Sequence, residues 1–556
     1  MKNIEIYDTT LRDGAQMRDI SFSVNDKLRI LEILDDLGVA YVEGGWPGAN
    51  PKDVDFFVEA KKLNLKNTKL TAFGSTRKAN TRIEEDPILA ALLRADTEVI
   101  CIVAKSSAWQ VENTMRASLE ENLAMLDESV RYLKAQGREV FVDAEHFFDG
   151  YKDNAEYSKQ FIETAIKAGA DRMVLCDTNG GSLPEQVYDV TKTLVDAYGK
   201  DIAFGIHAHN DGELAVANSI RAIRAGATQV QATVNGYGER CGNANMISII
   251  ANLQLKYAAD KLQCIPEENL PKLTSVAKAV AEIANMNMNH SQAFVGERAF
   301  THKGGLHASA LAKDKTSYEH INPDIVGNRT TVVVSDQSGL SNIIDWFANN
   351  NIDLGNETLQ KEAASAVLFK VKELESEGYS FENASASFEL LVKRTLEERF
   401  MDVYPKGSLI PDYFDLLETN VHVVNGEKTE ATVRIKIAGQ EKHSASLGNG
   451  PTNALDMALR KALQDLYPEV DNFQLQDFKV RILDSHLGTA AITKVQISTG
   501  KVSEHEFSQE HWDTLGLSAN IVKASWDAVV ESIVYGLVSQ GVASRNRNNS
   551  SANNVN

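Results

Sequence analysis

The first half of the chain alternates eight times between a short β-rich run and a longer stretch with helical periodicity. Each alternation predicts one βα unit, and eight units in roughly 250 residues are what a closed (β/α)8 barrel requires, whereas a doubly wound open sheet normally uses fewer. We therefore expect an α/β fold that begins with a TIM barrel. The eight β-rich runs span residues 4–8, 41–46, 69–75, 97–104, 139–145, 172–177, 202–209 and 229–236.

Local helix signals agree with this alternation. Ser23 can cap a helix whose first turn contains Asp26, and leucines then recur along one face until Gly38. A glycine likewise stands shortly before several of the later β-rich runs. The sequence therefore predicts the boundaries of the helices as well as those of the strands.

Three further segments follow the barrel, which we expect to occupy residues 1–270. Residues 271–394 are mostly helical in pattern and predict linker subdomains. Residues 395–542 predict an α+β domain of two ββα-like halves, because pairs of strands, the first pair forming a hairpin, are each followed by a helix. Residues 543–556 are polar and lack apolar anchors, so we expect a disordered tail.

Charge and cysteine content exclude several classes of protein. Lys and Arg number 57 against 77 for Asp and Glu, and the net charge of −20 disfavours nucleic acid or an anionic membrane as a partner. The four cysteines are widely spaced without a CxxC pair, so neither a thiolate zinc site nor a disulfide framework is indicated. Acidic residues interrupt the first residues, and no run is long enough to cross a bilayer, which predicts a cytoplasmic protein.

The strongest signal for chemistry is the segment HAHND, residues 207–211, at the end of the seventh β-rich run. Because side chains alternate along a strand, His207 and His209 point the same way and can share a metal ion. A single histidine would more often be a hydrogen-bonded core residue. A pair at the carboxyl end of a barrel strand, where the active sites of such barrels lie, favours a metal site.

The first run ends in DTTLRDG, which places Arg12 and Asp13 at the same rim. Taken alone, an Arg–Asp pair on the surface would contribute little. Beside two imidazoles, however, Asp13 adds an oxygen ligand, and this mixed set suits Mg²⁺, Mn²⁺ or Zn²⁺ better than a thiolate-selecting metal. Further polar side chains follow three other runs and converge on this rim: Asp143, Glu145, Thr178 and Asn243.

This constellation suits a 2-oxo acid, whose carboxylate and ketone oxygens can chelate a divalent ion together. The ion would polarise the ketone, and Arg12 would stabilise the alkoxide formed when a carbon nucleophile attacks. Glu145 or a distant histidine would move the protons. His307 lies in a loop outside the barrel and, like Tyr318, is equally consistent with an exposed loop residue.

Three motifs resemble the signatures of the DRE-TIM metallolyase group: DTTLRDGAQ at 8–16, HAHND at 207–211 and GNAN at 242–245. Within the group, the chain is similar to the branch of 2-isopropylmalate, homocitrate and citramalate synthases. GNGPTNAL at 448–455 and KVRILDSHLGTAAITKV at 479–495 resemble the regulatory domain of that branch, which a lyase of the group would lack. The resemblance therefore implies a catalytic barrel and a C-terminal regulatory domain.

The resemblance also implies roles for the metal-binding residues and a reaction. Asp13, His207 and His209 would ligate a divalent ion, with Asn243 as a further ligand or a neighbour of the ligands. The reaction implied is condensation of the acetyl-CoA enolate with the ketone of a 2-oxo acid, followed by hydrolysis of the thioester.

Roles for five other residues follow from the same resemblance. Arg12 would stabilise the oxyanion, Glu145 would take part in acid–base chemistry or bind the oxo acid, and Thr178 would hold the carboxylate of the oxo acid. His307 corresponds to a histidine implicated in deprotonating the acetyl group of acetyl-CoA, and Tyr318 corresponds to a tyrosine that reaches the site.

Two departures within the branch bear on the substrate. EGGWPGANPKD at 43–53 and DAEHFFDG at 143–150 resemble the (R)-citramalate synthase subgroup, whose oxo acid is pyruvate. Trp46 is bulkier than the phenylalanine in the isopropylmalate synthase pattern and would shrink the space for the side chain of the oxo acid. Discrimination of this kind is worth only about 1–3 kcal/mol. The implied partners are acetyl-CoA, pyruvate, isoleucine as a feedback effector of isoleucine synthesis, and a second copy of the chain in a homodimer.

Alternatives from the same and other classes stay open at this point. The chain could act on 2-oxoisovalerate or 2-oxoglutarate, which CoA release with each oxo acid would reveal. A lyase or aldolase would act without acetyl-CoA and would give residues 395–540 no role. A non-catalytic scaffold that binds amino acids would show no dependence on a divalent metal.

Overall fold

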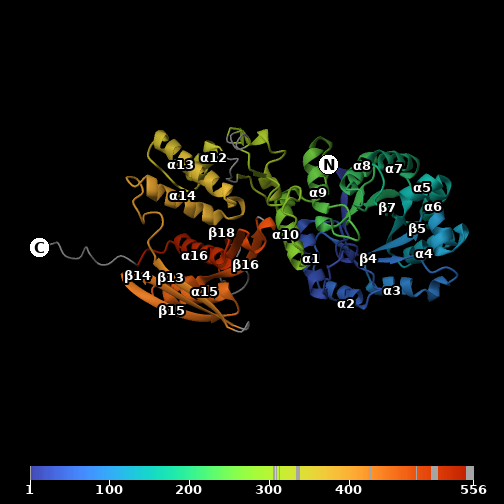
Figure 1. Cartoon of the computed structure of the whole chain (residues 1–556). Coiled ribbons are helices and arrows are strands. Elements are labelled where there is room, and N and C mark those ends of the chain that lie inside the picture. The colour runs from blue at the N-terminus through green and yellow to red at the C-terminus, as the bar shows by residue number, and fades with distance from the viewer. Residues whose placement is uncertain are drawn as a thin grey trace. The chain divides into compact units, whose positions relative to one another are not determined.

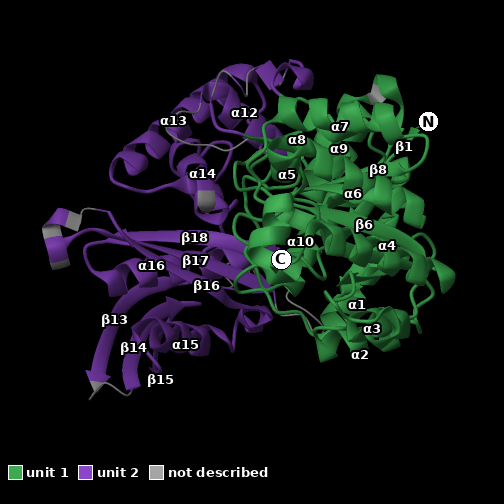
Figure 2. Cartoon of the chain, turned by 90° about the vertical axis from the view of Figure 1, so that its right-hand side faces the viewer, with its two compact units in different colours: residues 1–301, 319–331 green, residues 302–318, 332–556 purple. Residues whose placement is uncertain are grey.

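The computed structural model of the chain forms two compact units (Figure 2). The first contains residues 1–301 and 319–331, and the second contains residues 302–318 and 332–556. The first unit thus extends past the expected boundary at residue 270, because the helix that follows packs its apolar face into the barrel core. The structure describes residues 2–304, 307, 310–311, 313–332, 339–424, 428–483, 485–501 and 511–545.

The first unit is a closed barrel of eight parallel strands, as the eight β-rich runs predicted. The barrel closes where the first of its strands pairs with the last in a register that sets Glu5 beside Gln229 and Asp8 beside Ala232. The strands are β2 (Glu5–Asp8), β3 (Tyr41–Gly45), β4 (Lys69–Ser75), β5 (Val99–Lys105), β6 (Glu139–Glu145), β7 (Arg172–Asp177), β8 (Ala203–Ala208) and β9 (Gln229–Ala232).

The eighth strand is shorter than the β-rich run that predicted it. β9 ends at Ala232, and Val234–Gly236 forms a short 3-10 turn in which Asn235 has a left-handed φ of 59°. The following loop folds back on this turn, since the Thr233 amide donates to the Ala244 carbonyl. The loop that carries Asn243 is thereby held at the mouth of the barrel.

Helices connect the strands and surround the barrel (Figure 1). The expected capping box is present at the first helix, where Ser23 and Asp26 exchange hydrogen bonds and Gly38 ends the helix with a φ of 90°. The helices of this unit are α1 (Val24–Leu37), α2 (Pro51–Ala60), α3 (Pro87–Ala95), α4 (Leu119–Ala135), α5 (Phe147–Asp153), α6 (Ala155–Ala168), α7 (Pro184–Tyr198), α8 (Ala215–Ala225), α9 (Met246–Ala251) and α10 (Leu273–Ile283).

Two separate apolar clusters explain why chemistry is confined to the ends of the strands. Ile6, Val42 and Ile100 belong to the large core between strands and helices. Their neighbours in the sequence, Tyr7 and Cys101, face the opposite way and join a smaller buried cluster inside the barrel. The interior is therefore packed with side chains, and the polar residues predicted from the strand ends lie at its rim.

The second unit begins with a helical region and continues into the expected α+β domain. The helical region has its own core, formed around Ile343, Phe347 and Val367. Each half of the α+β domain contains a three-stranded antiparallel sheet, so the prediction of two-stranded halves was wrong. The elements are α12 (Leu340–Asn349), α13 (Glu357–Ser376), α14 (Ser385–Arg399), β13 (Asp415–Val424), β14 (Lys428–Ile437), β15 (Gln440–Gly448), α15 (Pro451–Leu463), β16 (Phe473–Ile482), β17 (Thr493–Lys501), β18 (His511–Ser518) and α16 (Ile521–Ser539).

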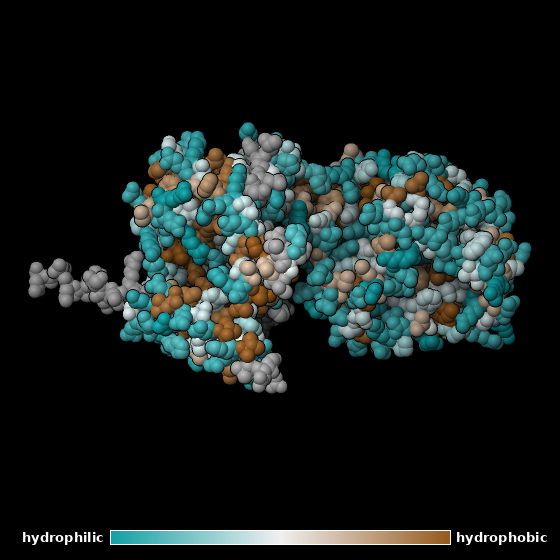
Figure 3. All heavy atoms as spheres, in the orientation of Figure 1, coloured by the Kyte–Doolittle hydropathy of each residue, from teal (hydrophilic) through white to brown (hydrophobic). Residues whose placement is uncertain are grey.

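The surface of the second unit carries apolar side chains that its core does not use. Figure 3 shows hydrophobic atoms gathered on this unit. Among the exposed apolar side chains of this unit are four on β16, where Leu475, Phe478, Val480 and Ile482 are 37–55% exposed. In the described part of the chain, no helix is long and apolar enough to span a membrane. The expected tail falls almost entirely outside the described residues.

A buried ion pair fixes the turn that follows β3. The Lys27 ammonium on α1 donates to the Asp53 carboxylate on α2 at 2.5 Å and to the Gly44 carbonyl at 2.9 Å. The other oxygen of Asp53 accepts from the Trp46 amide at 2.9 Å. Gly45 has a φ of +147°, and a Cβ there would lie 2.4 Å from the Asp53 carboxylate. The pair therefore joins two helices to the loop that carries Trp46.

We predict that Asp53→Ala lowers the free energy of unfolding by about 3–5 kcal/mol, because it leaves the Lys27 ammonium buried without its partner. Glu59→Ala is the matched control on the same helix. Its pair with Lys62 is solvent-exposed and is worth at most about 1 kcal/mol. Chemical denaturation of both variants checks this, and equal losses of stability would contradict it.

Candidate active site at the barrel mouth

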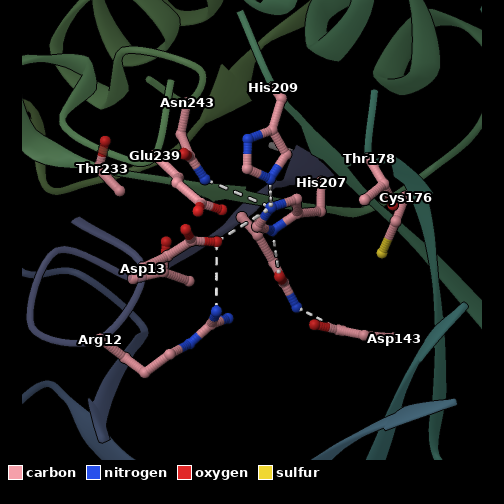
Figure 4. A network of polar contacts seen from close by, with 12 residues as sticks. Arg12, Asp13, Asp143, Cys176, Thr178, His207, His209, Thr233, Glu239 and Asn243 are labelled. Atoms are coloured by element: carbon pink, nitrogen blue, oxygen red, sulfur yellow. Dashed lines mark hydrogen bonds and ion pairs between the residues drawn. The ribbon is translucent and has the colours of Figure 1, made fainter. Parts of the chain in front are cut away.

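Asp13, His207 and His209 form a buried cluster at the carboxyl ends of the strands (Figure 4). One possible ligand atom from each lies within 4.8 Å of the others. The Nε2 atom of His207 is 3.3 Å from Asp13 Oδ2 and 3.3 Å from His209 Nε2. Three side chains from two segments far apart in the sequence thus present donor atoms to one small volume.

The loop that carries Asp13 is anchored to the end of β2 and to the segment that follows β9. The Asp8 carboxylate accepts from the backbone amide and the hydroxyl of Thr10. The Thr10 hydroxyl in turn accepts from the Val234 amide, which follows β9. Burial raises the pKa of Asp8 to about 7 even though Thr10 opposes the shift. These bonds hold the DTTLRDG loop against the loop that carries Asn243.

The electrostatics of the cluster favour an ionised Asp13 and a neutral His209, whereas burial alone would lower the pKa of His207 but Asp13 raises it. Burial alone would raise the pKa of Asp13, but Arg12 and His207 hold it well below its usual range. Burial lowers the pKa of His209 to about 4, and the neighbouring His207 contributes to the shift. Asp13 is therefore an anion and His209 a neutral imidazole at neutral pH.

Asn243 borders the cluster, and two polar atoms near it lack partners in the part of the chain that the structure describes, although His209 and Asn243 face His207 with Nε2 and with the amide nitrogen. Asn243 Oδ1 and His209 Nδ1 are buried and have no hydrogen-bond partner among the described residues. The Asn243 amide nitrogen lies 3.3 Å from His207 Nε2, so its side chain borders the same volume. Amide oxygen, carboxylate oxygen and imidazole nitrogen together match the ligand preferences of Mg²⁺, Mn²⁺ and Zn²⁺.

Arg12 is held rigidly beside this cluster. Its Nε donates to Glu43 Oε1 at 2.5 Å, one terminal nitrogen lies 3.3 Å from Asp13 Oδ2, and its guanidinium lies 3.8 Å from the centre of the Phe73 ring. Tyr7 donates its hydroxyl hydrogen to the other Glu43 oxygen at 2.7 Å. Burial alone would lower the pKa of Arg12, but Glu43 and Asp13 raise it above its ordinary value. Arg12 is therefore a fixed cation.

Glu43 also belongs to the site, although it was not predicted from the sequence. It is fully buried on β3, and it orients Arg12. Its position near the carboxyl end of a barrel strand was the available signal, because site residues of such barrels come from strand ends. Trp46, in the loop after the same strand, packs edge-to-face against Phe73 with 5.5 Å between the ring centres.

Glu145 and Thr178 lie on neighbouring strand ends. Glu145 pairs with Lys105, the last residue of β5, at 2.5 Å. The Thr178 hydroxyl oxygen accepts from the His146 amide at 2.8 Å, which ties the ends of β6 and β7 together. Asp143 is more deeply buried than Glu145, and its carboxylate faces the interior of the barrel (Figure 4).

His307 and Tyr318 belong to the second unit. Their rings stack with 4.0 Å between the ring centres, and the ring of His302 lies 6.1 Å from that of His307. A histidine and a tyrosine are thus held together in the segment HKGGLHASALAKDKTSY. Their roles in proton transfer remain predictions.

The chain matches three family models. The model described as HMGL-like covers residues 3–280, and the model described as homocitrate synthase post-HMGL domain-like covers residues 294–378. The model described as LeuA allosteric (dimerisation) domain covers residues 384–537. The matches confirm the family likeness that the sequence motifs indicated.

Curated relatives match along almost their whole length. The (R)-citramalate synthase of Aquifex aeolicus (strain VF5) is 50% identical over 97% of this chain and 98% of that protein. The (R)-citramalate synthases of Geobacter sulfurreducens and of Synechocystis sp. (strain PCC 6803) are each 45% identical. The match to the Geobacter protein covers 97% of this chain and 98% of that protein, and the match to the Synechocystis protein covers 96% of each.

We predict that Asp13→Ala and His209→Ala abolish measurable Mn²⁺ binding and leave the fold intact, because each removes a donor atom from the cluster. Asp211→Ala is the control in the same HAHND segment, since Asp211 is exposed and pairs with Arg240. Isothermal titration with Mn²⁺ and circular dichroism check this. Wild-type affinity in Asp13→Ala would exclude the cluster as the binding site.

Proposed function

The chain belongs to the (R)-citramalate synthase family, and from this premise we propose that it condenses acetyl-CoA with pyruvate and hydrolyses the product thioester to (R)-citramalate and CoA. The observation that carries the proposal is 45–50% identity to citramalate synthases across both units of the chain. The buried cluster of Asp13, His207 and His209 beside Arg12 supplies the chemistry that such a condensation needs.

We assign the metal site to Asp13, His207 and His209, with Asn243 beside them. A divalent ion bound there would act as a Lewis acid on the ketone of the oxo acid. Arg12 would stabilise the negative charge that develops on the ketone oxygen, and Glu43 keeps its guanidinium oriented before the reaction begins. A preoriented cation in a buried site needs no reorganisation during the reaction.

The carbon–carbon bond forms between the acetyl methyl carbon and the ketone carbon. His307, with Tyr318 stacked on it, is proposed to take a proton from the acetyl methyl group. The resulting enolate attacks the ketone carbon of pyruvate, and the ketone oxygen becomes an alkoxide that is then protonated. Water afterwards attacks the thioester carbon, and CoA leaves as the thiol.

Thr178 and Glu145 are proposed to hold and protonate the oxo acid. Because the Thr178 hydroxyl oxygen already accepts from the His146 amide, its own O–H can be donated to the carboxylate of the oxo acid. Glu145 is paired with Lys105, which keeps its carboxylate at the rim for acid–base chemistry. Both side chains are partly exposed and therefore accessible to a ligand at the mouth.

Trp46 and Phe73 support pyruvate as the oxo acid. Phe73 lies under the Arg12 guanidinium, and Trp46 packs edge-to-face on Phe73. These two rings fill space next to the group that would face the ketone. A larger substituent on the oxo acid would have to displace them, at about 1–3 kcal/mol for a difference of one or two methylene groups.

We further propose that the second unit forms a homodimer and binds isoleucine as a feedback effector, which places the reaction in isoleucine synthesis in the cytoplasm. The match to a LeuA allosteric (dimerisation) domain supports dimerisation and an effector. The four exposed apolar side chains of β16 supply a surface that a second copy could cover.

We predict that the purified chain releases CoA from acetyl-CoA fastest with pyruvate, in the presence of Mg²⁺ or Mn²⁺. A thiol-release assay with pyruvate, 2-oxoisovalerate and 2-oxoglutarate measures the preference, and chiral chromatography identifies (R)-citramalate. A chelator should stop the reaction. A clear preference for 2-oxoisovalerate would assign the chain to a different synthase, and activity without acetyl-CoA would indicate a lyase.

We predict that isoleucine slows thiol release by the full chain and has no effect on a chain that ends at residue 394, because the proposed effector site lies beyond that residue. The assay compares both proteins at saturating pyruvate, with leucine as the control amino acid. Equal inhibition of the two chains would move the effector site out of the C-terminal domain.

A further inference from the structure

The second ring nitrogen of His207 leads into a buried hydrogen-bonded chain that the proposed mechanism does not use. His207 Nδ1 lies 2.8 Å from Gln231 Oε1, and Gln231 Nε2 donates to Asp143 Oδ1 at 2.7 Å. The Cys101 thiol donates to the same Asp143 oxygen at 3.2 Å. All four side chains are at most 5% exposed.

The groups around Asp143 show which side chains donate and which accept along this hydrogen-bonded network. The Gln231 amide turns its NH₂ group toward Asp143 Oδ1, which also accepts from the Cys101 thiol, and turns its oxygen toward His207. Burial raises the pKa of Asp143, and a proton on the other oxygen would leave Oδ1 able to accept both bonds. An amide oxygen can only accept. His207 therefore donates from Nδ1, and its Nε2 faces Asp13 and His209.

Two links of this network join residues on adjacent strands, β8 with β9 and β5 with β6, and the third link, from Gln231 to Asp143, crosses the interior of the barrel. β9 pairs with β8 and β2, whereas Asp143 lies on β6, two strands beyond β8. Gln231 thus braces His207 against a carboxylate on a more distant strand. Such a brace fixes both the proton position and the angle of the imidazole ring.

Gln229 shows that this arrangement is specific to Gln231. It lies two residues earlier on β9 and faces the same side of the strand, and it is also fully buried. Neither its side-chain nitrogen nor its oxygen has a hydrogen-bond partner among the described residues. Burial of a glutamine on this strand does not by itself produce a hydrogen-bonded chain.

We propose that Gln231 and Asp143 are positioning residues that keep a proton on Nδ1 of His207 and aim its Nε2 at the metal centre. This inference rests on the proposed metal centre. Neither residue touches the reacting atoms, and their effect passes through His207. Cys101 adds a second donor to Asp143 and steadies the end of the chain.

The test compares Gln231→Leu with Gln229→Leu in the full-length protein, with Mn²⁺ as the probe in isothermal titration. Gln231→Leu should weaken Mn²⁺ binding about 10–100-fold, as loss of a group that orients a metal ligand usually does. Gln229→Leu should bind Mn²⁺ as the wild type does. Equal weakening in both variants would overturn the proposal in favour of a general effect of packing, and wild-type binding by Gln231→Leu would also overturn it.

A spectroscopic readout examines the proton itself without any metal. In the metal-free protein labelled with ¹⁵N-histidine, at a pH where His207 is neutral, the wild type should show the proton on Nδ1. The His207 signals are assigned by their loss in His207→Gln. A wild type protonated on Nε2 would overturn the proposal. This readout shows which ring nitrogen of His207 carries the proton even if the wild type binds no Mn²⁺. Absence of Mn²⁺ binding by the wild type would instead contradict the proposed metal centre.

A pair of substitutions tests whether exchanging the donor and acceptor groups at positions 231 and 143 restores Mn²⁺ binding. Gln231→Glu alone sets two carboxyl groups against each other and should weaken Mn²⁺ binding. Adding Asp143→Asn supplies an NH₂ group that can donate to the carboxylate introduced at position 231, while the other oxygen of that carboxylate still accepts from His207. Recovery of Mn²⁺ affinity in the double variant supports the proposal, and a double variant as weak as Gln231→Glu alone counts against it.

Discussion

Pairing of β2 with β9 closes the barrel, and the cluster of Asp13, His207 and His209 depends on that closure. It brings the loop after the first barrel strand against the loop after the last, so that the Val234 amide donates to a Thr10 hydroxyl 224 positions away. Asp13 and Asn243 come from these two loops, and His207 lies on the strand next to the closing one. A register slip of one residue would turn the inward side chains of β9 outward and would remove Gln231 from the interior.

The mouth of the barrel concentrates carboxyl groups in a volume shielded from water. Arg12 is a single guanidinium, and it pairs with Glu43 and Asp13 at once, while Asp143 lies buried nearby. Burial raises the pKa of Glu43 and of Asp143, which reflects the cost of keeping carboxylates in this environment. A bound divalent cation would offset that cost. The buried carboxyl groups therefore favour a bound divalent cation, as the geometry of the donor atoms also does.

Features set by local patterns could be predicted from the sequence, and features set by distant contacts could not. The capping box at Ser23 and the eight strands follow from signals within a few residues. β15 has the polar sequence QEKHSASLG and forms a strand because it pairs with β14 along its length, which no local pattern reveals. Strand ends pointed to Asp13, His207 and His209. Glu43 and Gln231 were not predicted, because they act through hydrogen bonds with Arg12 and His207 that form only in the folded barrel.

The buried pair of Lys27 and Asp53 connects the stability of the barrel to the position of the aromatic side chains beside Arg12. A pair of apolar side chains in the same place could stabilise the packing of α1 on α2 equally well. It could not accept the hydrogen bond from the Trp46 amide, and it could not bind the Gly44 carbonyl. The ionic pair therefore fixes a backbone conformation and not only a helix contact. Since Trp46 packs on Phe73, and Phe73 lies against Arg12, this fixed backbone sets the distance between the aromatic wall and the cation that would face the oxo acid.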